Sequence, residues 1–152
     1  MRYKAIVMYD GTMFHGFQTQ DNLRTVQQEI EDVLKIITKT ETKIHAAGRT
    51  DTGVHALGQV FHFDTIVEMK EWQMKNAINS RLPRDVYIKS IEIVDESFHS
   101  RYNAKTKTYR YVIDLNEFNI KKKGTKIVFY LCKDGIKVPL FVNAKTYCAR
   151  LN

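Results

Sequence analysis

Residues 25–38 read Thr-Val-Gln-Gln-Glu-Ile-Glu-Asp-Val-Leu-Lys-Ile-Ile-Thr and carry the clearest helical pattern in the chain. Thr25, followed three positions later by Gln28, fits the capping box that begins many helices. The apolar residues behind this start recur at the spacing of one helix face. They are Val26, Ile30, Val33, Leu34 and Ile37. The pattern therefore predicts a helix over residues 25–38.

Strand patterns lie on both sides of this helix. Residues 3–9 are rich in Tyr, Ile, Val and Met and run into the turn pair Asp10-Gly11, which is typical of a strand. Residues 43–47 and 58–64 favour two more strands. Residues 85–94 favour another, and the change of apolar parity between Ile88 and Ile91 indicates a bulge.

A second helix is predicted over residues 69–80, ending before Pro83, with Trp72, Met74, Ala77 and Ile78 as buried candidates. The order of elements is then β-α-β-β-α-β, followed by one alternating segment at 108–115. This order predicts an α+β fold, a ferredoxin-like antiparallel sheet with both helices on one face. Such a fold carries many activities and predicts none by itself.

Composition and charge limit the class of protein. The 152 residues are 43% hydrophobic and 27% charged, which is enough to build a core, and no apolar run reaches transmembrane length. Two cysteines, Cys132 and Cys148, make no disulfide framework. We expect a soluble cytoplasmic protein without a membrane partner.

The net charge of +7 comes from one end of the chain. Residues 1–120 contain 16 basic and 16 acidic residues, whereas residues 121–152 contain eight basic residues and only Asp134. Both cysteines lie in this second segment. We therefore expect a domain over residues 1–120 and a basic tail of unknown structure over 121–152. Apolar stretches at 127–131 and 138–142 are suited to short strands.

The sharpest local feature is the segment Ala47-Gly-Arg-Thr-Asp-Thr-Gly-Val-His-Ala56. Gly48 and Gly53 bracket a tight loop that holds Arg49 and Asp51 two positions apart. A neighbouring arginine favours the ionised form of a carboxyl group, and a carboxylate can act as a nucleophile or a base. An ordinary turn, in which the aspartate bonds its own backbone, is an equally physical interpretation of these residues.

A second stretch, Phe98 to Tyr111, combines cations with aromatic rings and contains no acidic residue. Cations on phosphates and rings on bases are the usual means of holding unpaired nucleotides. We infer candidate RNA-backbone contacts at Arg101, Lys105, Lys107 and Arg110. The alternative is a half-buried strand with a solvated basic face. The five histidines are scattered, and no metal-ligand motif is present, so we expect no metal site.

Several segments in the same order resemble the tRNA pseudouridine synthase A (TruA) family, specifically its N-terminal half. The loop at residues 47–56 is the most specific of them, and together they extend over about residues 3–120. The other segments are Tyr9–Gln20, Val26-Gln27, Gln59-Val60, Asn79–Pro83, Phe98–Ala104 and Lys107–Tyr111.

The resemblance implies a chemistry and a set of residues. Asp51 would be the catalytic aspartate, Arg49 would help to splay out the target nucleotide, and Tyr109 would pack on the target uracil. The family isomerises uridine to pseudouridine at tRNA positions 38 to 40, in the anticodon arm, without metal or cofactor. Its members form homodimers and have a second half that closes the other wall of the cleft.

Residues 121–152 match no segment of that family pattern. A frameshifted or truncated gene product would have such a segment. Two functions therefore remain open at this point. One is a tRNA pseudouridine synthase that uses Asp51. The other is an inactive fragment that acts at most as a nonspecific RNA-binding module. A small-molecule enzyme has only the Asp51 loop in its favour.

Overall fold

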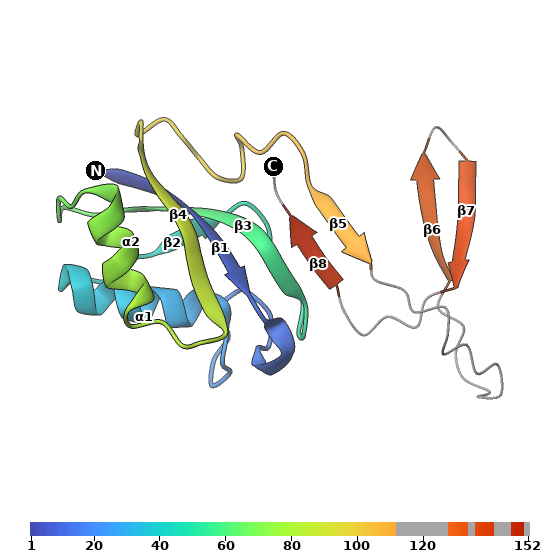
Figure 1. Ribbon diagram of the computed structural model, residues 1–152, viewed down its shortest axis with the longest axis horizontal. Coiled ribbons are helices and arrows are strands. Elements are labelled where there is room, and N and C mark those ends of the chain that lie inside the picture. The colour runs from blue at the N-terminus through green and yellow to red at the C-terminus, as the bar shows by residue number, and fades with distance from the viewer. Residues whose placement is uncertain (112–127, 134–135, 142–146, 151–152) are drawn as a thin grey trace.

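The computed structural model describes residues 1–111, 128–133, 136–141 and 147–150 (Figure 1). Two helices and four antiparallel strands form the first part of the chain. The strands are β1 (Arg2–Tyr9), β2 (Ile44–Ala46), β3 (His55–Asp64) and β4 (Val86–Val94), and the helices are α1 (Val26–Thr38) and α2 (Glu71–Asn79), with a short 3-10 turn η1 (Gly11–Met13).

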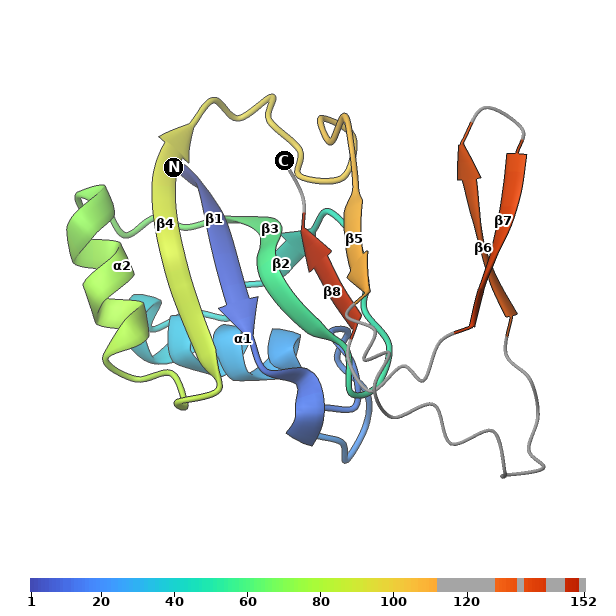
Figure 2. The ribbon, with the colours of Figure 1, turned by 45° about the vertical axis from the view of Figure 1, so that its right-hand side comes forward.

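The sheet has the strand order that the sequence predicts. Strand β1 pairs with both β3 and β4, and β2 pairs with β3, each time antiparallel. The order is therefore β4-β1-β3-β2, which confirms the α+β, ferredoxin-like expectation. Both helices lie on one side of the sheet (Figures 1 and 2).

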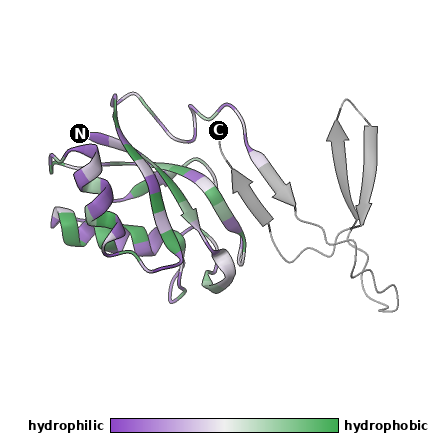
Figure 3. Cartoon of the chain, in the orientation of Figure 1, coloured by the Kyte–Doolittle hydropathy of each residue, from purple (hydrophilic) through white to green (hydrophobic). Residues whose placement is uncertain are grey.

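The core lies between that face and the two helices. Alternate residues of β1 are buried, as a strand with one covered face requires. Phe61 and Phe63 of β3 lie opposite Ala5 and Tyr3, and all four are inaccessible to solvent. Burying one such large apolar side chain contributes about 2 to 3 kcal/mol. Figure 3 shows the apolar residues of these strands and helices alternating with polar ones.

Helix α1 begins as predicted. The side chain of Thr25 accepts a hydrogen bond from the Gln28 amide, so it satisfies a donor that the first turn leaves open. Ile30 and Leu34 are fully buried. The carboxylate of Glu31 is buried too, and it accepts bonds from Lys43 Nζ at 2.8 Å and from the Ile44 amide at 3.1 Å. These bonds tie α1 to the start of β2.

Strand β4 contains the predicted bulge. Ile6 lies opposite Ser90, but the next residue of β1, Val7, lies opposite Ile88. Lys89 is therefore the extra residue, and it allows both Ile88 and Ile91 to face the core.

Two expectations require correction. Trp72 is 61% exposed, because Met74 and Ile78 take the buried face of α2 and residue 72 lies on its other side. Strand β3 begins at His55, three residues before the predicted start at Gly58, because Ala56 already pairs with Tyr9.

The second part of the chain contributes four more strands. They are β5 (Thr108–Tyr111), β6 (Val128–Lys133), β7 (Ile136–Phe141) and β8 (Tyr147–Arg150). Strand β8 pairs parallel with β3 and antiparallel with β5, and β6 pairs with β7 (Figure 2). Strands thus occupy both apolar stretches of the basic segment. The expected boundary near residue 120 lies outside the described residues.

Candidate active site

The loop between β2 and β3, residues 47–54, carries Arg49 and Asp51. At its start the Ala47 amide donates to the Val60 carbonyl at 2.8 Å. The side-chain amide of Gln59 donates to the carbonyl of Gly48. These two bonds fasten the first residues of the loop to the neighbouring strand β3.

The N-terminal loop, residues 10–24, packs against the Asp51 loop and supports it. The Phe17 amide donates to the Thr50 carbonyl at 3.0 Å, and the Gly53 amide donates to the Phe14 carbonyl at 3.2 Å. The Tyr9 hydroxyl lies 2.8 Å from Thr50 Oγ1. Burial raises the pKa of Tyr9 to about 12, so this hydroxyl keeps its proton at neutral pH. Hydrogen bonds thus hold the chain on both sides of Asp51, at Thr50 before it and at Gly53 after it.

Two glycines allow this close approach. A Cβ atom on Gly11 would lie 1.9 Å from the backbone oxygen of Val54, far inside contact distance. Gly16 has a φ of +90°, which side chains disfavour, and its Cβ would lie 2.8 Å from the Thr50 oxygen. Glycine is therefore required at both positions if the two loops are to touch.

His55 links the end of the Asp51 loop to the same support. The Gly11 amide donates to His55 Nδ1 at 3.1 Å, and Asp10 Oδ1 lies 3.0 Å from that nitrogen. One ring nitrogen does not accept and donate at once, and the backbone bond identifies Nδ1 as an acceptor. Hydrogen bonds from the Thr12 hydroxyl and amide lower the pKa of Asp10.

Asp51 itself is exposed at the tip of the loop. Within the described part of the chain, no hydrogen bond or ion pair engages its carboxylate, and the same is true of the exposed Arg49 guanidinium. The Val54 amide donates to the Asp51 carbonyl at 3.1 Å, which closes a turn around the residue. Asp51 therefore lies in a turn that its backbone closes, and among the described residues its side chain does not make the backbone bond of an ordinary aspartate turn.

A hollow of about 690 Å³ lies beside this loop. Its wall comes from β2, from the start of the Asp51 loop, from the N-terminal loop and from the segment after β4. The volume is in the range of small-molecule sites, so it accommodates a nucleotide. Among the described residues, four cationic side chains and no acidic one line it: Lys43, Arg49, Arg101 and Lys107.

Three of these cations form no ion pair with a described residue. They are Arg49, Arg101 and Lys107, whereas Lys43 is paired with Glu31 at 2.8 Å. The ammonium of Lys107 reaches over the loop, since a Cβ on Gly48 would meet Lys107 Nζ at 3.3 Å. Sequence positions 49, 101 and 107 therefore meet around one positively charged hollow.

Three candidates remain, Lys105, Tyr109 and Arg110. Lys105 is exposed and does not line the hollow. Tyr109 and Arg110 belong to β5, where the structure describes the backbone, and they pair with Ala149 and Cys148 of β8. Their roles stay predictions.

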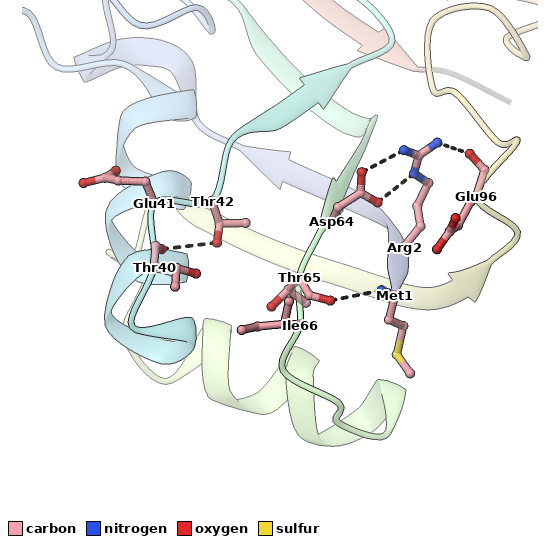
Figure 4. Close-up of a pocket in the computed structure, with 9 residues that line it drawn as sticks. All are labelled: Met1, Arg2, Thr40, Glu41, Thr42, Asp64, Thr65, Ile66 and Glu96. Atoms are coloured by element: carbon pink, nitrogen blue, oxygen red, sulfur yellow. Dashed lines mark hydrogen bonds and ion pairs between the residues drawn. The ribbon is translucent and has the colours of Figure 1, made fainter.

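A second hollow, of about 530 Å³, lies at the other end of β3 (Figure 4). Arg2 crosses it and binds Asp64 through two bonds of 2.8 and 2.7 Å. Arg2 also donates to the carbonyl oxygens of Glu96 and Phe98, the latter at 2.8 Å. This arginine is therefore a structural anchor that ties the segment after β4 to β1.

Sequence reasoning missed the residues that support the loop. They are Tyr9, Gly11, Gly16, Thr50, His55 and Gln59. The two glycines in the N-terminal loop were the available signal, but their partners lie 34 or more positions away in the sequence. Among the described residues, no group of three or more His, Cys, Asp or Glu side chains is arranged to hold a metal ion. No helix in this part of the chain has the length and apolarity needed to cross a membrane.

Together, the fold and the loop define an α+β domain that presents an exposed carboxylate two residues beyond Arg49, which lines a cationic hollow. The family described as tRNA pseudouridine synthase matches residues 5–103. The chain belongs to this family.

Curated relatives agree with that assignment. A protein of Exiguobacterium named tRNA pseudouridine synthase A is 47% identical over 129 residues, which cover 85% of this chain and 52% of the relative. A Bacillus cereus protein, tRNA pseudouridine synthase A 1, is 50% identical over 76% of this chain and 47% of its own length. A tRNA pseudouridine synthase A of Streptococcus pneumoniae is 48% identical over 74% and 46%. The chain spans about half the length of the curated relatives it matches.

Proposed function

We propose that this chain carries the catalytic aspartate of a tRNA pseudouridine synthase. Its substrate is uridine at tRNA positions 38 to 40, in the anticodon arm, and Asp51 is the reacting carboxylate. The observation that carries the proposal is the placement of Asp51, on a loop held by the N-terminal loop and two residues beyond Arg49, which lines the cationic hollow. Membership of the family gives the reaction class.

The reaction is an isomerisation, so its atoms balance without a second substrate. The glycosidic bond between ribose C1′ and N1 breaks, and a bond forms between C1′ and C5 of the turned base. The proton that leaves C5 is balanced by the one that N1 gains. A carboxylate supports this path by forming a transient covalent bond, either to the sugar or to the pyrimidine ring. Neither route requires a metal or a cofactor.

The uridine must leave its stack before a carboxylate on a loop can reach it. Arg49 lies two residues from Asp51 and lines the hollow, so it is suited to hold the extruded nucleotide. Tyr109, by the family resemblance, packs on the uracil. Arg101 and Lys107 bind phosphates at the hollow, and Lys105 and Arg110 extend this contact along the backbone.

Activity on tRNA would take place in the cytoplasm. The family resemblance further implies a homodimer whose contacts lie beyond the matched residues. Our proposal therefore assigns the catalytic loop to this chain and the remaining wall of the cleft to additional protein surface.

Nonspecific RNA binding without turnover is the second candidate. It is favoured by one observation, that Asp51 is exposed in this structure. A carboxylate open to water on one side stabilises a transition state less well than one in a closed cleft. Phosphate contacts alone also carry no sequence information, so they do not aim one uridine at Asp51.

A chimera separates the two candidates. Residues 5–103 of this chain replace the matching segment of the Bacillus cereus relative, and the product is incubated with unmodified tRNA. Pseudouridine is then mapped by mass spectrometry of the digested tRNA. We expect it at positions 38 to 40. RNA binding without any pseudouridine supports the second candidate, and pseudouridine only at other positions contradicts the assigned substrate.

A further inference from the structure

Four aromatic rings form a continuous row on the sheet face opposite the helices. His45 of β2 lies directly across from His62 of β3, and their ring centroids are 5.0 Å apart. His62 meets the ring of His99 edge-on at 4.7 Å. His99 in turn stacks on Tyr102, with centroids 4.3 Å apart and an interplanar angle of 30°.

Exposure changes along the row. His62, near its centre, is 1% exposed, whereas His45 and Tyr102 at its two ends are exposed, Tyr102 at 79%. One face of the tyrosine ring is covered by His99, so the remaining exposed surface of this ring is available to another planar group. His45, His99 and Tyr102 all line the cationic hollow beside the Asp51 loop.

The outer pair is held by a tight turn. The His99 amide donates to Asn103 Oδ1 at 2.7 Å, and the Asn103 amide donates back to the His99 carbonyl at 2.9 Å. The Arg101 amide donates to His99 Nδ1 at 3.2 Å. These bonds fix the His99 ring although it lies near the surface, so Tyr102 stacks on a positioned partner.

His62 fixes the row to the sheet. The Ser100 amide donates to His62 Nδ1 at 3.2 Å, which makes this nitrogen an acceptor and places the ring proton on Nε2. Burial, and then the nearby His99 and Arg2, lower the pKa of His62 to about 4. The centre of the row is therefore an uncharged, packed ring at neutral pH, and the unpaired cations lie around it.

We propose that Tyr102, backed by His99, is a stacking site for an unpaired nucleobase of the RNA that occupies the hollow. Arg101 and Lys107 lie along the same wall, where they bind the phosphates on either side of that base. The inference rests on the proposed function only in taking RNA as the ligand. It adds a base contact that lies outside the Asp51 loop.

The chemistry of the site favours a nucleic acid over a protein partner. An exposed ring and cations that form no ion pair with a described residue match a stacked base flanked by phosphates, and none of the described lining residues is acidic. A tyrosine platform accepts any base, because every base has a π face. The site therefore contributes affinity and helps to keep a nucleotide out of its stack, with little sequence preference.

The test measures binding of the full chain to a short single-stranded RNA by fluorescence anisotropy. We expect Tyr102→Ala to weaken binding about tenfold and Tyr102→Phe to bind as the parent does, since phenylalanine keeps the ring. Tyr87→Ala is the matched control, because Tyr87 is another exposed tyrosine, 47% accessible, on the far edge strand β4. It should leave the affinity unchanged.

Salt dependence distinguishes stacking from charge. Tyr102→Ala should lower affinity by the same factor at every salt concentration, whereas Arg101→Gln should reduce the slope of affinity against salt. Equal affinity of Tyr102→Ala and the parent overturns the proposal, as does a Tyr102→Phe variant that binds as weakly as Tyr102→Ala. An absence of RNA binding by the parent chain overturns it as well. Because the assay needs no turnover, binding of the chain through Tyr102 together with a chimera that forms no pseudouridine contradicts the proposed function alone.

Discussion

Replacing Gly11 by alanine tests whether the N-terminal loop supports the Asp51 loop. The added Cβ would lie 1.9 Å from the Val54 oxygen and 2.4 Å from its carbonyl carbon. Ordinary contacts of a Cβ begin near 3.4 Å, so the two loops must separate by about 1.5 Å. Both sides of the contact are backbone, and no side chain can rotate away.

The expected cost follows from two terms. Overpacking of this kind costs about 1 to 3 kcal/mol. Separation of the loops also lengthens the hydrogen bond from the Gly11 amide to His55 Nδ1, which costs about 1 kcal/mol more. We therefore expect Gly11→Ala to lower the free energy of unfolding by about 2 to 4 kcal/mol.

Gly48→Ala is the matched control in the neighbouring loop. Its Cβ would meet the tip of the flexible Lys107 side chain at 3.3 Å, and that tip can move. The free energy of unfolding should change by less than about 1 kcal/mol.

Urea denaturation of the full chain measures both values, and amide hydrogen exchange over residues 47–54 reports the loop directly. Gly11→Ala should speed this exchange, whereas Gly48→Ala should leave it near the parent rate. If the two variants are equally stable and exchange alike, the loops do not support each other. In the chimera, a displacement of this size should also reduce turnover about a hundredfold or more.

Three further outcomes are expected. The pKa of His62 is about 4 in the folded chain and about 6.5 when unfolded, so the unfolded state takes up protons first. The free energy of unfolding should therefore fall by up to about 3 kcal/mol between pH 6.5 and 4. The urea midpoint should change less with pH in His62→Gln than in the parent, whereas in His15→Gln it should change as it does in the parent. Arg24→Lys should cost about 1 kcal/mol in the same assay, since lysine does not reproduce the fork to Asp85 at 2.7 and 3.0 Å, and an unchanged midpoint would argue against that fork. Because Asp51 is exposed in this structure, the 152-residue chain should bind tRNA in a salt-sensitive way with little isomerase activity, and tritium release at close to the rate of the Bacillus cereus relative would contradict this.

Local sequence patterns were sufficient for most of the fold. The cap at Thr25 and the spacing behind it predicted α1, because a helix is specified by residues three or four positions apart. The change of parity at Ile88 and Ile91 predicted the bulge in β4 for a similar reason. The prediction that Trp72 is buried was wrong, since hydrophobicity alone does not say which side of a short helix meets the sheet.

The site was less accessible to sequence reasoning. Asp51 and Arg49 lie two positions apart, so their loop was visible as a motif. The contact of Gly11 with the Asp51 loop depends on the register between β1 and β3. The row of rings depends on the register between β2 and β3 and on the path of the segment after β4, since it joins His45, His62 and His99. Such contacts join residues 17 to 54 positions apart, and no local pattern specifies them.

Tritium release from tRNA labelled at uridine C5 shows whether Asp51 is the reacting carboxylate. The chimera is compared with its Asp51→Asn variant, which is nearly isosteric, and with Asp21→Asn, an exposed aspartate in the N-terminal loop. We predict that Asp51→Asn releases no tritium above background while binding tRNA within about twofold of the parent, and that Asp21→Asn keeps the parent rate. Release by Asp51→Asn at close to the parent rate would contradict the account.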